Sequence, residues 1–140
     1  MTAVVVDSSA VAAIVLGEPE RERFHGYLLS VSGLMSAATR VELGFVLLKK
    51  YGVDRLPHFW EVIDRYNFTL APVDSAQVEV ALDALARFGR GRRRPPAVLN
   101  YGDVFAYALA KSRDLPLLYK GNGFSKTDVR PALPQSGQEA

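Results

Sequence analysis

Asp103 lies near the start of an apolar, helix-like stretch, NYGDVFAYALAK, at residues 100–111. Asn100 is a favoured N-cap residue, and an acid three residues later complements the positive end of the helix dipole, a contribution of about 0.3 to 1 kcal/mol. The local sequence therefore fits a helix cap as well as a functional acid. Whether Asp103 is a cap or a functional acid depends on whether the fold brings other carboxylates close to it.

Two further aspartates follow predicted strands. Asp7 comes directly after the β-branched run VVV, so its side chain should lie at the carboxyl end of that strand, although it would also suit the N-cap of a following helix. Asp128, in the segment KTDV, comes after the last clear strand and could equally be a turn residue that bonds its own backbone. Taken one at a time, neither residue identifies a site.

Glu42 is placed more unusually, on the apolar stripe of a predicted helix. Its neighbours at three and four residues include Ala38, Phe45 and Val46, and a charge on a stripe that faces a core requires a partner. The alternative is a capping box with Thr39, which fits the pattern S/T-x-x-E. Ser36 competes with Thr39 as the cap, which leaves both interpretations open.

The elements that must position these acids alternate along the chain. Short β-branched or apolar runs at 3–6, 33–36, 68–73 and 116–119 predict strands, and helical spacing predicts helices at 9–16, 19–29, 37–51, 56–66, 74–88 and 100–111. Strands that alternate with helices favour right-handed crossovers and a parallel sheet covered on both faces. We therefore expect an α/β fold, a three-layer α/β/α domain with a central parallel sheet.

In such a sheet, ligands bind beyond the carboxyl ends of the strands, so Asp7, Glu42, Asp103 and Asp128 should all project toward one rim. Like charges at one site repel and raise each other's pKa unless a cation is present. A hard, oxygen-seeking ion such as Mg²⁺ or Mn²⁺ relieves the conflict. Acids gathered around a divalent ion indicate phosphodiester chemistry, in which the metal activates a water and stabilises charge on the phosphate.

Composition limits the alternatives. A chain of 140 residues with 49% hydrophobic content predicts one domain, at residues 1–133, with a disordered tail at 134–140. The absence of cysteine excludes disulfides and thiolate chemistry, and His25 and His58 lack a second histidine at ligand spacing. No apolar run is long enough to span a membrane, so we expect no membrane partner and a cytoplasmic location.

Four segments carry a resemblance to a known family. VVVDSSAV, RVELG, LNYGDVFAYALAK and PLLYKGNGFSKTDV, in that order, resemble the PIN-domain ribonucleases, specifically the VapC-type toxins of bacterial toxin–antitoxin pairs. Each motif is weak alone, but four in order at the family's spacing make a strong signal, and the match covers nearly the whole chain. The resemblance implies a PIN-like fold, RNA cleavage, homodimerisation and inhibition by a cognate VapB-type antitoxin.

The resemblance also implies residue roles. Asp7, Glu42 and Asp103 would bind Mg²⁺, with Mn²⁺ as a substitute, and Ser9 would help to position the metal or its water. One departure stands out: such toxins often have an acid before the Phe of a turn that here reads GNGF, where this chain has Gly123. Asp128 is then the remaining candidate for a fourth catalytic acid.

The charged residues near these acids suggest how RNA could be held. Net charge is only +2, yet RFGRGRRRPP places five arginines within residues 87–94. We expect Arg92, Arg93 and Arg94 to bind RNA phosphates, with a further contact from Lys120, although a solvated charge run and an ordinary turn lysine are the plain alternatives.

The sequence thus predicts a metal-dependent endoribonuclease toxin. Two alternatives stay open: a DNA-directed metal-dependent nuclease, and a catalytically weak PIN-like module that binds RNA or an antitoxin. Six apolar residues on helical stripes exceed what one core requires, so part of their surface is expected to form a dimer interface or an antitoxin groove. These residues are Phe24, Leu28, Phe45, Leu48, Phe59 and Ile63.

Overall fold

The computed structural model describes residues 1–89 and 98–134. Its centre is a four-stranded sheet in the order β3-β2-β1-β4, in which each pair of neighbouring strands is parallel. The strands are β1 (Ala3–Val6), β2 (Ser32–Ser36), β3 (Thr69–Ala71) and β4 (Leu117–Leu118). The predicted parallel sheet is confirmed, and its two edge strands, β3 and β4, are shorter than expected.

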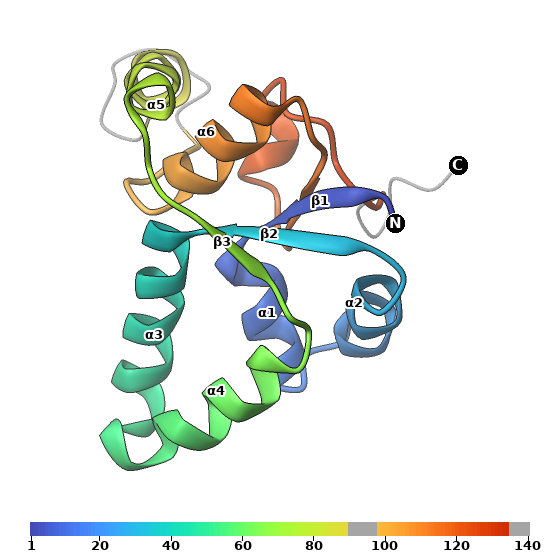
Figure 1. Ribbon diagram of the computed structural model, residues 1–140. Coiled ribbons are helices and arrows are strands. Elements are labelled where there is room, and N and C mark those ends of the chain that lie inside the picture. Colours follow the sequence, from blue (N-terminus) through green and yellow to red (C-terminus); the bar gives the residue numbers. More distant parts are fainter. Residues whose placement is uncertain (90–97, 135–140) are drawn as a thin grey trace.

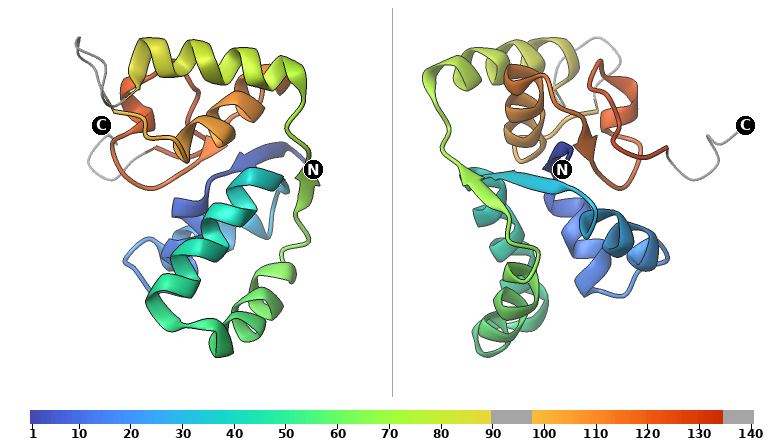
Figure 2. Two further views of the ribbon diagram at one scale, coloured as in Figure 1. Left: turned by 90° about the vertical axis from the view of Figure 1, so that its left-hand side faces the viewer. Right: turned by 45° about the vertical axis from the view of Figure 1, so that its right-hand side comes forward.

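Within residues 1–89 and 98–134, α-helices cover both faces of this sheet (Figures 1 and 2). On one face lie α1 (Ser8–Val15), α2 (Arg21–Leu28), α3 (Ala37–Tyr51) and α4 (Leu56–Asp64), and on the other lie α5 (Ser75–Phe88) and α6 (Asp103–Arg113). Short 3₁₀ turns lie at Val53–Arg55 and Phe124–Lys126. This arrangement is the three-layer α/β/α domain that the alternating pattern predicts.

The sheet is buried on both faces, because successive residues of β1 point into different cores. Val4 and Val6 belong to the cluster packed under α1–α4, and Val5 belongs to the cluster packed under α5 and α6. A short, uninterrupted β-branched run is what a central parallel strand with two buried faces requires. The same burial brings the end of β1, and the acid that follows it, into the interior of the molecule.

The order of the strands sets where a ligand site can form. The connections from β1 to β2 and from β2 to β3 run through α1–α4 on one face, whereas the path from β3 to β4 runs through α5 and α6 on the other. The chain therefore adds strands on one side of β1 first, as β2 and β3, and on its other side last, as β4. The winding reverses between the neighbouring strands β1 and β4. In parallel sheets, the crevice beyond the carboxyl ends of the strands at such a point is the usual binding site.

Several expected boundaries differ in the structure. The helix predicted to begin at Asn100 begins at Asp103, and the helix expected to run to residue 66 ends at Asp64. The helix predicted to stop before Gly52 does so, and that glycine has a φ of +83°, a value that side-chain-bearing residues rarely adopt. Among the described residues, no helix has the length and apolar character needed to cross a lipid bilayer.

Of the six apolar residues expected to exceed one core, the structure places four in the core and leaves two on the surface. Phe24, Leu28, Phe59 and Ile63 are buried in the core under α1–α4. Phe45 is 63% exposed and Leu48 is 41% exposed. Helical spacing identified one apolar stripe on each helix, but α2 and α4 turn their stripes inward against α1 and α3, whereas α3 carries additional apolar residues on its outer side.

Candidate metal centre

Asp7 is a buried carboxylate whose two oxygens have different surroundings. The residue is 2% exposed, at the point where β1 ends and α1 begins. Oδ2 accepts a hydrogen bond of 3.1 Å from the backbone N–H of Ser9, which is the N-cap contact of α1. Oδ1 is buried without a hydrogen-bond partner among the described residues. The cap interpretation is therefore confirmed for one oxygen and leaves the other without a structural explanation.

Burial raises the pKa of Asp7 to about 7. The hydrogen bonds from Ser9 lower this pKa, while the charges of Asp103 and Glu42 raise it further. A buried carboxylate is costly to ionise unless water or a positive partner compensates its charge. The site thus contains an acid whose ionised form requires a positive partner.

Glu42 comes from the second turn of α3 and reaches the same region. Its Oε1 accepts a hydrogen bond of 2.7 Å from the hydroxyl of Ser8. Burial raises the pKa of Glu42, the bond from Ser8 lowers it, and the charge of Asp103 raises it. The capping-box alternative is wrong, because α3 is capped by Ser36, whose hydroxyl accepts from the backbone N–H of Ala38 at 3.2 Å.

Asp103 forms a reciprocal cap at the start of α6. The Asn100 side-chain oxygen accepts from the Asp103 backbone N–H at 3.0 Å, and Asp103 Oδ2 accepts from the Asn100 backbone N–H at 2.9 Å. The interpretation of Asp103 as a cap is therefore structurally correct. It is also incomplete, since the charge of the same carboxylate raises the pKa of both Asp7 and Glu42.

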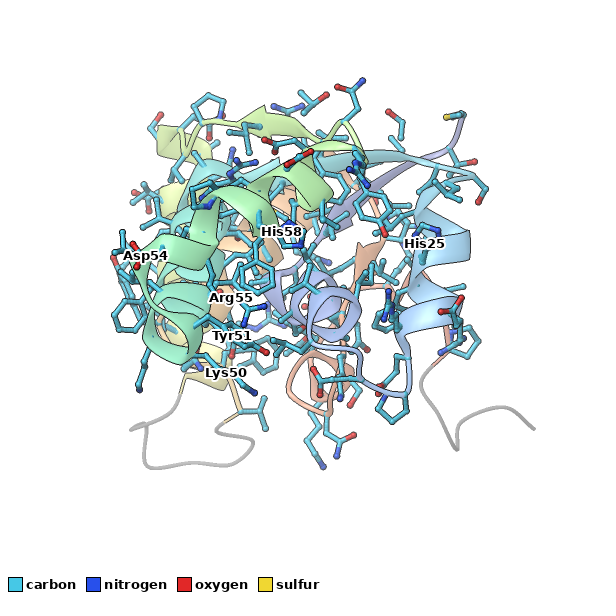
Figure 3. All side chains as sticks on the ribbon, turned by 90° about the horizontal axis from the view of Figure 1, so that it is seen from below. His25, Lys50, Tyr51, Asp54, Arg55 and His58 are labelled. Carbon is cyan, nitrogen blue, oxygen red and sulfur yellow. The ribbon has the colours of Figure 1, made fainter. Side chains whose placement is uncertain are left out.

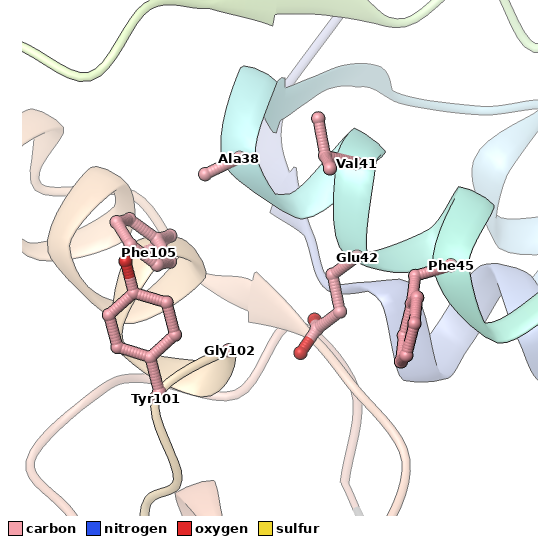
Figure 4. A pocket seen from close by; sticks show the side chains of 7 residues that line it. All are labelled: Ala38, Val41, Glu42, Phe45, Tyr101, Gly102 and Phe105. Atoms are coloured by element: carbon pink, nitrogen blue, oxygen red, sulfur yellow. The ribbon is translucent and has the colours of Figure 1, made fainter.

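The three acids border one pocket of about 280 Å³. Its lining comes from the end of β1, from α1, from α3 and from the start of α6, and consists of Asp7, Ser8, Ser9, Ala12, Glu42, Leu43, Val46, Asn100 and Asp103. Segments that are far apart in sequence thus present three carboxylates to a single small volume. A larger, mostly apolar groove of about 500 Å³ adjoins it and shares Glu42 as a wall (Figure 4).

The donor set fits a hard divalent cation in kind, because Mg²⁺ and Mn²⁺ prefer carboxylate oxygens and water. The Asp7 oxygen that has no hydrogen-bond partner among the described residues is the clearest candidate ligand atom. The arrangement is open, however: among residues 1–89 and 98–134, no three acidic or histidine side chains already stand together as a metal-ligand set.

The histidines have other surroundings. His25 Nδ1 lies 2.5 Å from the hydroxyl of Tyr66, and His58 packs against Phe59. They lie on different helices, α2 and α4, as the view from below shows (Figure 3). Neither histidine lines the pocket of the three acids.

Two serines connect the pocket to the rest of the fold. The hydroxyl of Ser9 accepts from the backbone N–H of Lys120 at 3.0 Å, which joins the end of β4 to the start of α1. Ser8 holds Glu42, a role that the sequence analysis missed. The doublet Ser8-Ser9, directly after a strand-terminal Asp, was the available signal, because the first turn of a helix places consecutive hydroxyls on different neighbours.

The structure does not bring Asp128 to the other acids. Its carboxylate accepts from the hydroxyl of Tyr107 at 2.5 Å and pairs with Lys111 at 3.3 Å and Arg87 at 3.5 Å. None of these partners lines the acid pocket. The role of Asp128 in this structure is to join the C-terminal segment to α5 and α6.

The cations predicted to bind RNA divide into two groups. The ammonium group of Lys120 pairs with Glu18 and, at 3.3 Å, with Glu20, so two carboxylates already neutralise it. The predicted contact of Lys120 with RNA stays a prediction, and its backbone N–H bonds Ser9 at the site. Arg92, Arg93 and Arg94 lie outside the described residues.

Comparison with known proteins agrees with this geometry. The sequence matches the model of the PIN domain over residues 4–130. It is 40% identical over 128 residues to a Ribonuclease VapC of Mycolicibacterium smegmatis, a match that covers 89% of this chain and 96% of that relative. The chain belongs to the VapC family of PIN-domain proteins.

Solved structures share the fold of this PIN domain at low sequence identity. VapC20 of Mycobacterium tuberculosis, described as a sarcin-ricin-loop-cleaving toxin, superposes with a TM-score of 0.73 at 15% identity, covering 94% of this chain and 99% of that one. VapBC2 of Rickettsia felis, solved with a promoter DNA fragment, gives 0.70 at 9% identity, covering 96% and 98%. The resemblance drawn from four short motifs is thus confirmed.

Proposed function

We propose that this PIN domain is a metal-dependent endoribonuclease toxin, neutralised by a VapB-type antitoxin and active in the cytoplasm. The observation that carries the proposal is the shared pocket of Asp7, Glu42 and Asp103, in which one buried oxygen of Asp7 has no partner among the described residues. The chain is similar to a ribonuclease over nearly its whole length, which supports RNA cleavage as the reaction in that pocket.

Asp7, Glu42 and Asp103 would hold Mg²⁺ or Mn²⁺. The bound ion would supply a Lewis acid that activates water and offsets charge on the phosphate. The protein's own residues prepare the site: Ser8 fixes the Glu42 carboxylate, and the N-cap bond from Ser9 fixes one oxygen of Asp7 so that the other remains available to a ligand.

RNA binding requires positive charge, which none of the described residues lining the pocket supplies. We assign this role to Arg92, Arg93 and Arg94, which precede α6 in the sequence. Each phosphate contact to single-stranded RNA contributes about 0.7 to the slope of log affinity against log salt. Replacement of the three arginines by alanine should therefore weaken RNA binding and flatten its salt dependence, while the melting temperature stays unchanged. An unaltered slope would exclude these residues from the RNA path.

A second candidate function is a module that binds RNA or antitoxin without cutting. Two observations favour it: within the described part of the chain, the three acids are not yet assembled as a ligand set, and Asp103 is engaged as a cap. Cleavage assays on RNA and on DNA of the same sequence, in Mg²⁺, in Mn²⁺ and in EDTA, separate the possibilities. RNA cleavage abolished by EDTA supports the enzyme, DNA cleavage supports the nuclease alternative, and no cleavage with retained RNA binding supports the module.

The antitoxin partner is proposed from solved structures that share this fold. A solved structure with the same fold, at a TM-score of 0.63 and 14% identity, is a toxin–antitoxin complex from Klebsiella pneumoniae. Co-expression with the product of an adjacent reading frame should give a stable complex in which RNA cleavage is suppressed. A cleavage rate unaffected by that product, at concentrations that saturate any complex, would contradict the assignment.

A homodimer is proposed from an apolar face over α3, α5 and the start of α6. Its large side chains are each more than 40% exposed: Val41, Phe45, Val78, Leu82 and Tyr101. Two adjoining grooves run between them and share Tyr101 and Phe105. A contiguous apolar face of this kind marks an interface, and a two-fold axis would pair the face with its own copy.

The dimer is tested by sedimentation at micromolar concentration. Phe45→Glu should convert the dimer to monomer, because it places two charges in the paired face. Leu29→Glu is the matched control, since Leu29 is 60% exposed and follows α2, on the far side of the molecule from α3 (Figure 1). A wild-type monomer, or equal effects of the two changes, would reject this face.

A further inference from the structure

Gly102 immediately precedes α6 and has an ordinary helical backbone. Its φ is −66° and its ψ is −35°, a conformation that alanine adopts without strain. The reason for glycine at this position is therefore not found in the backbone. The atoms around the position of the missing side chain supply the reason.

The space beside Gly102 is filled by the carboxylate of Glu42. A Cβ added to Gly102 would overlap Glu42 Oε2, and would lie 2.5 Å from its Cδ and 3.2 Å from Oε1. Figure 4 shows the Glu42 side chain extending from α3 toward the segment that carries Gly102. A carboxylate can approach the chain this closely only because position 102 has no side chain.

Glu42 is also held on a second side. Ser8 donates its hydroxyl to Oε1 at 2.7 Å, and this bond joins residues 34 positions apart. Oε2 lies against Gly102, so the two oxygens of one carboxylate face α1 and the start of α6 respectively. Glu42 therefore spans the gap between the elements that carry the other two acids, Asp7 and Asp103.

We propose that Gly102 is a positioning residue: it provides the slot in which Glu42 is held, by Ser8, next to Asp7 and Asp103. A side chain at position 102 would push the Glu42 carboxylate out of the pocket without altering the backbone of α6. The proposal rests on the metal site assigned above, for which it explains how the third ligand reaches the other two.

The first test uses the metal-free protein and does not depend on metal binding. In a crystal structure of Gly102→Ala, the Glu42 carboxylate should have left the start of α6 and broken its bond to Ser8. A Ser8–Glu42 bond preserved in that variant would overturn the proposal. If Gly102→Ala fails to fold, the proposal requires that adding Glu42→Ala restores folding, and a double variant that still fails to fold also overturns it.

The second test is Mn²⁺ affinity, measured by electron paramagnetic resonance of the free ion. Gly102→Ala should weaken Mn²⁺ binding about 10- to 100-fold, the range for residues that orient a metal ligand. The same change in a Glu42→Ala background should have no further effect, because the displaced group is already gone. Equal losses of Mn²⁺ affinity in both backgrounds, or wild-type affinity in Gly102→Ala, would refute the proposal that Gly102 positions Glu42.

Gly26→Ala is the matched control, since a Cβ at this position of α2 would meet nothing within 4 Å. It should bind Mn²⁺ like the wild type. The two proposals fail differently in these measurements. If the metal site itself is wrong, wild-type protein and Glu42→Ala bind Mn²⁺ equally weakly, yet the structure of Gly102→Ala still decides whether Gly102 positions Glu42.

Discussion

The molecule has two clusters of charged side chains beside α6, and they differ in how their negative charge is compensated. Around Asp128, the carboxylate has Lys111, Arg87 and the hydroxyl of Tyr107 as partners. In the pocket of Asp7, Glu42 and Asp103, carboxylates border one another, and no lysine or arginine of the described residues lines the cavity. One cluster contains its own cations, and the other is where we propose that a metal ion binds.

The pKa directions report the same contrast. Burial opposes ionisation of Asp128, but the bonds from Tyr107 and Lys111 and the charges of Lys111 and Arg87 outweigh it and lower its pKa. Burial raises the pKa of Asp7 and of Glu42, and neighbouring acids raise both further. An acid with a lowered pKa and several partners indicates a structural role, whereas a group of acids with raised pKa values indicates a site for a positive ligand.

The largest expected effect comes from Asp103→Asn. This change removes one negative charge from the pocket, and we expect RNA cleavage to fall by about 100-fold or more, with weaker Mn²⁺ binding. Because the crowded carboxylates repel one another, the metal-free melting temperature should stay unchanged or rise. An active variant with a lowered melting temperature would mean that Asp103 is only the cap that its bonds with Asn100 describe.

An intermediate effect is expected from pH. Cation binding needs the ionised form of Asp7, whose pKa is raised to about 7, so Mn²⁺ affinity should rise about tenfold per unit up to pH 7 and level off above it. Charges of Glu42 and Asp103 contribute to this pKa, so Glu42→Gln should move the midpoint to lower pH. Calorimetric titration between about pH 5.5 and 8.5 measures the curve, and a flat curve would contradict the raised pKa.

The same shift has a consequence for stability without metal. The folded protein holds a proton on Asp7 up to about pH 7, whereas the unfolded chain releases it near the ordinary aspartate pKa of 3.8. Because the folded state binds more protons in this window, its stability should fall as pH rises from about 4 to 7. Saturating Mn²⁺ should reverse the loss above about pH 7, which thermal melts at about pH 5 and pH 8 would measure.

The smallest effect is expected from Asp128→Asn, the same chemical change made in the other cluster. It weakens two partly exposed ion pairs, which are worth about 1 kcal/mol or less each, so the melting temperature should fall by a few degrees at most. Mn²⁺ affinity and RNA cleavage should stay within about twofold of the wild type. A loss of cleavage as large as that of Asp103→Asn would remove the distinction between the clusters.

Sequence alone determined the local features of this protein. The run VVV before Asp7 predicted a buried strand, Asn100 and Asp103 predicted a helix cap, and Gly52 predicted a helix end. Each depends on residues a few positions apart, whose backbone preferences and caps act within one or two turns. The α/β alternation followed from the same short-range patterns.

The tertiary structure decided which of these features meet. Phe45 and Phe59 occupy similar helical stripes, but only the packing of α4 against α1 and α3 buries Phe59 and leaves Phe45 exposed. Asp7 and Asp128 were both predicted to lie at the same rim of the sheet. Asp128 instead accepts a hydrogen bond from Tyr107, 21 residues earlier, and belongs to another cluster. Glu42 is held by Ser8 from 34 residues away. Charge pairing and burial depend on distances in space, which spacing along the chain does not specify.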